Sequence, residues 1–153
     1  MIEISPENVS GFVVGEGCFY VESGFDKKYK LKHRIRPAFC IEVKAEDREI
    51  LEAIRDILGC GKVYELDFGR YQGYQDKKWK PHVKYRVSNQ ADLIQKVVPF
   101  FEKYPLFGKK LEAFKVFKEI LKGLSKGEQK TPQGLENLKK TANQLKTVNK
   151  KGI

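Results

Sequence analysis

Residues 9–17 read Val9-Ser10-Gly11-Phe12-Val13-Val14-Gly15-Glu16-Gly17 and run directly into Cys18-Phe19-Tyr20-Val21. A helix is predicted to begin just before this stretch, because Ser5 is a favoured N-cap residue and Pro6 suits the first helical position. The helix must stop near Gly15-Glu16-Gly17, and the aromatic and β-branched residues that follow favour a strand. The sequence therefore predicts a helix that is followed directly by a strand, and the remaining elements are predicted from the residues on either side.

Beyond this junction, apolar residues alternate with polar ones in some segments, as in strands, and recur every three or four residues in others, as in helices. Further strands are predicted over about residues 30–44, 62–68 and 82–87, and further helices over about 46–58, 89–101, 109–124 and 131–146. Pro37 predicts a bulge or an edge position in the second strand, because proline has no N–H for the ladder. The order α-ββ-α-ββ-α with added helices predicts an α+β fold with a four-stranded antiparallel sheet.

The composition is typical of a globular chain: 41% of the 153 residues are hydrophobic and 33% are charged. No stretch approaches the roughly 18 apolar residues of a membrane span. We therefore expect a soluble protein without a membrane partner, from the bacterial or archaeal cytoplasm or from an organelle. The three cysteines contain no CxxC pair, which favours free, buried thiols over a zinc site or disulfides.

The net charge of +10 favours a polyanionic partner such as nucleic acid. Residues 24–44 contain two acids, Asp26 and Glu42, and these basic residues: Lys27, Lys28, Lys30, Lys32, Arg34, Arg36 and Lys44. Strand alternation places Lys32, Arg34 and Arg36 on one face. The last strand pair repeats the pattern with Lys84 and Arg86. One interpretation is a solvated sheet face; the other, favoured by the repetition, is a cationic β-ribbon that binds the major groove of DNA.

The stretch 9–17 resembles the signature nonapeptide of the LAGLIDADG endonuclease family, in which a strand also follows. Further similar segments stand in the family's order: Phe39-Cys40-Ile41-Glu42-Val43, the helix end and strand start at 54–63, and the run from Pro99 to Phe117. The similarity covers about residues 5–125, which would form the core of a single domain over residues 1–153. Residues 126–153 would then be a C-terminal helical extension.

This resemblance implies an active site at the end of the first helix. Glu16 matches the family's catalytic, metal-binding aspartate, and the Gly15 carbonyl is implied as a second ligand for Mg²⁺, or for Mn²⁺ or Ca²⁺ at the same sites. Lys110, or its neighbour Lys109, matches a basic residue near that site. Val43 stands at a catalytic position where the family usually has a glutamine that positions water, so this position lacks its polar group.

The resemblance also implies two binding surfaces. The residues that contact DNA would be Tyr20, Glu22, Lys28, Lys32, Arg34, Arg36, Cys40, Tyr64, Leu66, His82, Lys84 and Arg86. A dimer interface would be formed by Ser10, Gly11, Val14 and Gly15. Small residues on a helix let two backbones approach closely. Since the nonapeptide occurs once, the resemblance implies a homodimer that reads a long, roughly palindromic site in double-stranded DNA.

The function implied is that of a site-specific homing endonuclease, encoded in a mobile intron, that cuts double-stranded DNA by metal-dependent phosphodiester hydrolysis. Two alternatives use the same scaffold: an RNA-binding maturase that assists intron splicing, and a DNA-binding protein without cleavage activity. A cleavage test separates the enzyme from both. A preference for duplex DNA over folded intron RNA separates the enzyme from the maturase.

Overall fold

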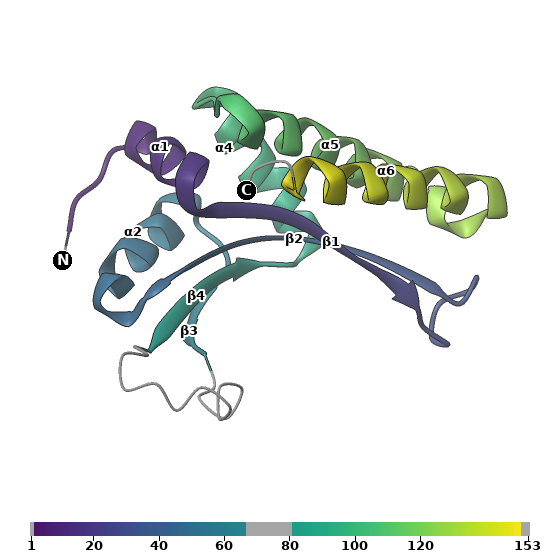
Figure 1. The fold of residues 1–153 in the computed structure, drawn as a ribbon, viewed down its shortest axis with the longest axis horizontal. Coiled ribbons are helices and arrows are strands. Elements are labelled where there is room, and N and C mark those ends of the chain that lie inside the picture. Colours follow the sequence, from purple (N-terminus) through teal and green to yellow (C-terminus); the bar gives the residue numbers. More distant parts are fainter. Residues whose placement is uncertain (1, 67–80, 151–153) are drawn as a thin grey trace.

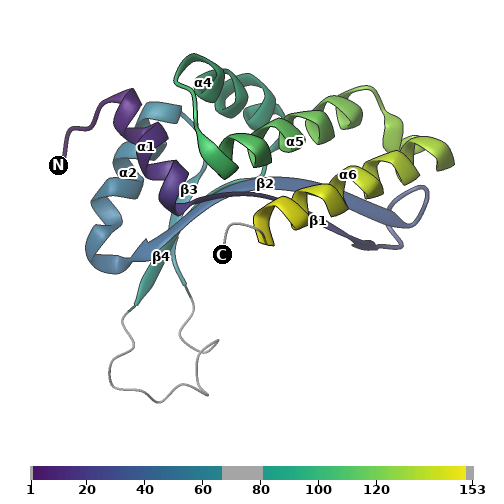
Figure 2. The same cartoon turned by 45° about the horizontal axis from the view of Figure 1, so that its top comes forward.

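The computed structural model describes residues 2–66 and 81–150. Its elements are α1 (Pro6–Glu16), β1 (Gly17–Phe25), β2 (His33–Lys44), the 3₁₀ turn η1 (Ala45–Asp47), α2 (Arg48–Leu58), β3 (Lys62–Glu65), β4 (His82–Val87), α3 (Gln90–Asp92), the π turn η3 (Leu93–Val97), α4 (Val98–Lys103), α5 (Gly108–Ser125), the 3₁₀ turn η4 (Glu128–Lys130) and α6 (Pro132–Lys150). The predicted α+β fold with an antiparallel four-stranded sheet is confirmed. The helices lie on one side of an arched sheet and leave its concave face open (Figures 1 and 2).

The passage from α1 into β1 has no loop. Ser5 caps α1 as predicted, because its hydroxyl accepts a hydrogen bond from the Asn8 amide at 3.0 Å while the Asn8 side chain accepts one from the Ser5 amide at 3.0 Å. At the other end, a Cβ added to Gly17 would lie 2.6 Å from Cγ1 of Val13. Any side chain at Gly17 would therefore force the helix and the strand apart.

The sheet has the strand order β1-β2-β4-β3, and each neighbouring pair is antiparallel. The ladder between β1 and β2 runs without interruption over Gly17–Phe25. The ladder between β2 and β4 ends at Phe39, so Pro37 lies where β2 is paired on its β1 side alone within the described sheet. Of the two predictions for Pro37, the edge position is confirmed and the bulge is wrong.

The turn between β1 and β2 corrects the predicted start of the second strand. β2 begins at His33 rather than near residue 30, because Lys32 adopts a left-handed conformation with φ 56°. The Lys32 carbonyl accepts a hydrogen bond from the Asp26 amide at 3.0 Å, which closes the turn. Lys32 therefore lies in the turn and does not share a strand face with Arg34, as had been predicted from alternation.

Three other predicted elements differ at their ends. The helix predicted over residues 89–101 consists of α3, η3 and α4, and the last helix extends to Lys150. The strand predicted over 62–68 ends as β3 at Glu65, and its last two residues lie outside the described chain. The predicted helix end at Gly59 is confirmed, because Gly59 adopts the left-handed conformation (φ 75°) that terminates α2.

An aromatic cluster joins the sheet to the helices. Phe19 of β1 is fully buried, and its ring centroid lies 4.9 Å from that of Phe39 and 5.8 Å from that of Phe101. The rings of Phe114 and Phe117 on α5 lie 5.3 Å and 5.1 Å away. Because these rings come from both layers, their contacts fix the helices against the sheet.

Helix α6 covers β1, which is an edge strand of the sheet (Figure 2). The Asn149 side chain donates a hydrogen bond to the Phe19 carbonyl at 3.0 Å, so a backbone acceptor on this edge is paired. Over residues 2–66 and 81–150, no helix combines the length and the apolar character that crossing a membrane requires.

Replacing Phe19 with alanine is expected to lower the free energy of unfolding by about 3–5 kcal/mol, because the change empties the centre of the aromatic cluster. Phe25→Ala is the matched control on the same strand, since that side chain is 69% exposed; its effect should stay below about 0.5 kcal/mol. Urea denaturation followed by circular dichroism measures both values. Equal losses for the two variants would contradict the placement of Phe19 at the core.

Candidate nucleic-acid interface and acidic site

The strand register assigns the two faces of the sheet. Phe19, Phe39 and Tyr85 lie on the face that packs against the helices. The open face carries Cys18, Tyr20, Glu22, Arg34, Arg36, Cys40, Glu42, Lys62, Tyr64, His82, Lys84 and Arg86. Most residues predicted to contact DNA thus come together on one surface, including the arginines of β2 and the basic pair of β4.

Four predicted contact residues lie off the sheet or are largely covered: Lys28, Lys32, Leu66 and Cys40, of which Cys40 lies on the open face but is buried. Lys28 and Lys32 are exposed in the turn between β1 and β2, where the Lys28 amide donates to the Asp26 carboxylate at 3.0 Å. Leu66 follows β3 but is only 7% exposed, and its amide donates to the His82 carbonyl at 3.1 Å. Leu66 continues the alternation of Lys62 and Tyr64 on the open face, but its side chain is largely covered, so its contact with DNA stays a prediction.

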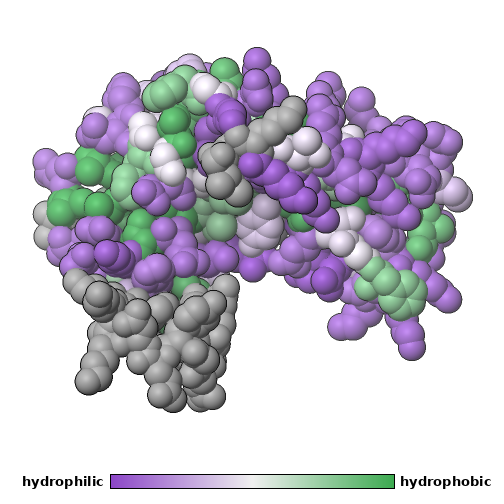
Figure 3. All heavy atoms as spheres, viewed as in Figure 1, coloured by the Kyte–Doolittle hydropathy of each residue, from purple (hydrophilic) through white to green (hydrophobic). Residues whose placement is uncertain are grey.

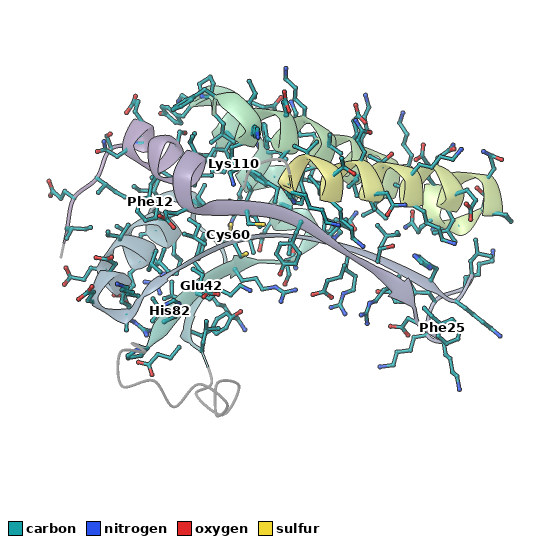
Figure 4. The ribbon with its side chains drawn as sticks, viewed as in Figure 1. Phe12, Phe25, Glu42, Cys60, His82 and Lys110 are labelled. Atoms are coloured by element: carbon teal, nitrogen blue, oxygen red, sulfur yellow. The ribbon has the colours of Figure 1, made fainter. Side chains whose placement is uncertain are left out.

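Two carboxylates on the open face pair with side chains of β4. Arg86 lies 3.2 Å from Glu22, and the His82 ring nitrogen lies 2.9 Å from the Glu42 carboxylate, as Figure 4 shows for the latter pair. The Arg86 guanidinium also lies 5.8 Å from the centroid of the Tyr20 ring. Burial raises the pKa of Tyr20 to about 12, so its hydroxyl stays protonated. These pairs could not be found in the sequence, because each joins residues of different strands.

The acid predicted to be catalytic lies at the end of α1. Glu16 is exposed, and no side-chain hydrogen bond or ion pair within the described part of the chain engages it. Lys110 of α5 donates a hydrogen bond from Nζ to the carbonyl of Gly17, the residue after Glu16. Figure 4 shows Lys110 beside the junction of α1 and β1. Of the two lysines considered, the structure places Lys110 at this site and leaves Lys109 exposed.

Val43 lies on the helix-facing side of β2, opposite Val83. Its side chain is half-buried and packs against the core. Glu42 projects from the other face toward His82, as strand alternation predicts, so it does not supply the polar group that Val43 lacks. Val43 is therefore an aliphatic residue at the position where the resemblance implies a polar catalytic residue.

The three cysteines are free thiols, as predicted, but only Cys40 is buried, while Cys18 and Cys60 are half-buried. Cys18 lies directly opposite Cys40 in the β1–β2 ladder. The hydrogen bond between the two thiols, aided by the charges of Lys110 and Lys84, lowers the pKa of Cys18. The same hydrogen bond, together with burial, raises the pKa of Cys40.

The outward surface of α1 carries two glycines. Gly11 and Gly15 are exposed, and a Cβ added to either would meet nothing within 4 Å in the described chain. Ser10 is different: it is only 5% exposed, and its hydroxyl donates to the Tyr104 carbonyl at 2.6 Å. The prediction that Ser10 belongs to a dimer interface is corrected, because Ser10 packs within the chain. Val14 is half-buried beside the two glycines.

Comparisons with known proteins agree with this geometry. The family model described as LAGLIDADG endonuclease matches residues 9–121. A probable intron-encoded DNA endonuclease 1 of Mycosarcoma maydis is 34% identical over 65% of this chain and 31% of its own length. A probable intron-encoded endonuclease 2 of Neurospora crassa is 27% identical over 88% of this chain and 28% of its own length. The chain thus spans less than a third of these fungal relatives.

Two solved structures share the fold. The homing endonuclease I-TnaI has 31% identity and a TM-score of 0.79, with 98% of this chain and 99% of that chain covered. The LAGLIDADG homing endonuclease I-LtrWI, solved with its target DNA, has 26% identity and a TM-score of 0.80, with 94% of this chain and 44% of that chain covered. The family match covers the nonapeptide, the sheet and most of α5, so the chain belongs to the LAGLIDADG endonuclease family.

Proposed function

We propose that this chain is a DNA endonuclease domain that binds duplex DNA on the open face of its sheet and cleaves it with Glu16 as the metal-binding acid. The observation that carries the proposal is the position of Glu16. Its carboxylate is exposed at the end of a helix, has no protein partner among residues 2–66 and 81–150, and lies one residue from the carbonyl that Lys110 holds.

The charge and shape of the open face favour duplex DNA as the substrate. A two-stranded ribbon fits the major groove, where arginine binds guanine and lysine neutralises phosphate. Arg86 lies 3.2 Å from Glu22, which orients its guanidinium on the open face. Arg34 lies on the same face and is 3.9 Å from Asp26.

The donor set at the end of α1 fits a hard divalent cation. The Glu16 carboxylate and the Gly15 carbonyl are oxygen ligands of the kind that Mg²⁺, Mn²⁺ or Ca²⁺ accepts. The described residues contain no group of three or more histidine, cysteine, aspartate or glutamate side chains that could hold a metal. Further oxygens would therefore come from DNA phosphates and a second acid. Such an ion supplies Lewis-acid stabilisation of phosphoryl charge and a more acidic bound water.

Lys110 is suited to stabilise negative charge that develops on the scissile phosphate. Its ammonium is positioned by the Gly17 carbonyl, which the junction of α1 and β1 fixes. A preorganised cation of this kind lowers the free energy of a charged transition state more than that of the substrate.

A second copy of the chain is the proposed source of the second acid. Glycine inside a helix costs about 0.5–1 kcal/mol relative to alanine, yet nothing in the described chain explains Gly11 and Gly15 by close contact. Contact of this surface with the same helix of a second copy would require small residues there and would bring two Glu16 residues near the two-fold axis. Hydrophobic residues also gather over the end of the molecule that holds α1 and α2 (Figure 3).

A DNA-binding protein without cleavage activity is the second candidate function. The observation that favours it is Val43, whose side chain offers no group to position water. The names of the fungal relatives support an intron-encoded homing endonuclease as the first candidate.

Glu16→Gln is expected to reduce cleavage by roughly a hundredfold or more, because the amide removes the charge that would hold the cation. Specific duplex binding should change little, since the open face is intact. Sequencing of cut products from a randomised duplex library in Mg²⁺, with binding measured in parallel, tests both. Glu119→Gln on the exposed surface of α5 is the control. Wild-type binding without cutting would instead support the second candidate.

Gly11→Leu is expected to weaken self-association by roughly tenfold or more, because overpacking at a close helix contact costs about 1–3 kcal/mol. Folding should be retained, since an added Cβ there has free space. Sedimentation velocity over a concentration series measures the effect. Glu119→Leu, an exposed helical position outside the proposed contact, should leave association unchanged. A monomeric wild type, or an unaffected Gly11→Leu chain, would contradict the homodimer.

A further inference from the structure

We infer that Cys18 and Cys40 form a site of reversible oxidation, in which a peroxide converts the two thiols to a disulfide and thereby slows DNA cleavage. The chemistry of the site stands on its own, and its effect on cleavage rests on the proposed function. The pair is distinct from the metal-binding acid and from Cys60.

The geometry brings the two sulfur atoms together. Cys18 and Cys40 are direct partners in the β1–β2 ladder and project from the same open face. Opposite residues in an antiparallel pair have Cα atoms about 4.5–5.5 Å apart, which lies within the range of about 4.4–6.8 Å found for disulfides. The register therefore suits a disulfide, and only a small approach of the two strands is needed before the bond can form.

The surroundings favour Cys18 as the first sulfur to react. Cys18 is half-buried, whereas Cys40 is 8% exposed, so an oxidant reaches Cys18 more easily. Greater exposure of one thiol makes oxidation selective for it.

The reaction balances with one peroxide for each pair. The Cys18 sulfur attacks the O–O bond of hydrogen peroxide and becomes a sulfenic acid, with release of one water. The Cys40 sulfur then attacks the Cys18 sulfur and displaces the second water, so the two thiols lose two electrons and two protons in all. A dithiol reductant returns both thiols by exchange and is itself oxidised to a disulfide.

Closing this bond would displace the active site. The Cβ atoms of opposite residues lie about 4.5–5.5 Å apart, but in disulfides they lie about 3.5–4.5 Å apart, so the strands must approach by about 1 Å. Cys18 follows Gly17, whose carbonyl holds Lys110, and Cys40 is the ladder partner of Arg86. A displacement of about 1 Å in a positioned site can slow a reaction by roughly a hundredfold.

The first test is chemical and does not depend on cleavage. The full-length chain is treated with hydrogen peroxide, the remaining thiols are blocked, and the digested protein is analysed by mass spectrometry. The expected product lacks two hydrogen atoms and contains a peptide pair joined through Cys18 and Cys40. A product in which Cys60 is joined, or in which Cys18 is overoxidised without a partner, overturns the proposal.

The second test compares the cleavage rate before and after peroxide within each variant. The wild type and Cys60→Ser should both lose activity by roughly ten- to a hundredfold and regain it in dithiothreitol. Cys18→Ser and Cys40→Ser should show no reversible loss, whatever their rates before treatment. An equal reversible loss in Cys18→Ser overturns the proposal. A wild type that never cleaves contradicts the proposed function, while the peptide link still decides whether the disulfide forms.

Discussion

The absence of a side chain at Gly17 is the constraint on which the rest of the structure depends. Because a Cβ there would collide with Val13, only glycine lets α1 pass into β1 without a loop. The side chains of Glu16, Cys18 and Phe19, which flank Gly17, then point in fixed directions. Glu16 ends the helix in solvent, Cys18 lies on the open face, and Phe19 enters the aromatic core. One steric requirement thus couples the candidate catalytic acid to the packing of the whole domain.

The same coupling explains how the open face can be both charged and ordered. The helices bury the other face, so the open face is free to carry side chains that hydrophobic packing would exclude. Ion pairs between strands, such as Glu22 with Arg86, keep long cationic side chains in defined positions. Exposed pairs of this kind add little stability. Their contribution is to orientation, which matters for a surface that must recognise a duplex.

The parts of the fold that could be predicted from sequence are those set by local chemistry. Ser5 and Pro6 begin α1, Gly59 ends α2, and alternation separates Arg34 and Arg36 from the core residues of β2. The resemblance placed Glu16 and Lys110 in one site, and the hydrogen bond from Lys110 to Gly17 brings them to the same junction. Their catalytic roles stay predictions.

What could not be predicted depends on contacts between distant segments. Ser10 has the small size that suits a helix interface, but the Tyr104 carbonyl draws it inward. Leu66 follows the same alternation as the residues predicted to contact DNA, yet its side chain is largely buried. The pairing of Glu42 with His82 follows from the register of β2 and β4, which no local pattern encodes.

A crystal structure of the chain with its duplex target and Ca²⁺ tests most directly whether Glu16 holds the metal ion beside DNA. We expect DNA across the open face of the sheet and an ion about 2.3–2.6 Å from the oxygens of Glu16 and Gly15, with a second copy supplying the other acid. DNA bound on the helical side, or ions held away from the end of α1, would contradict this expectation.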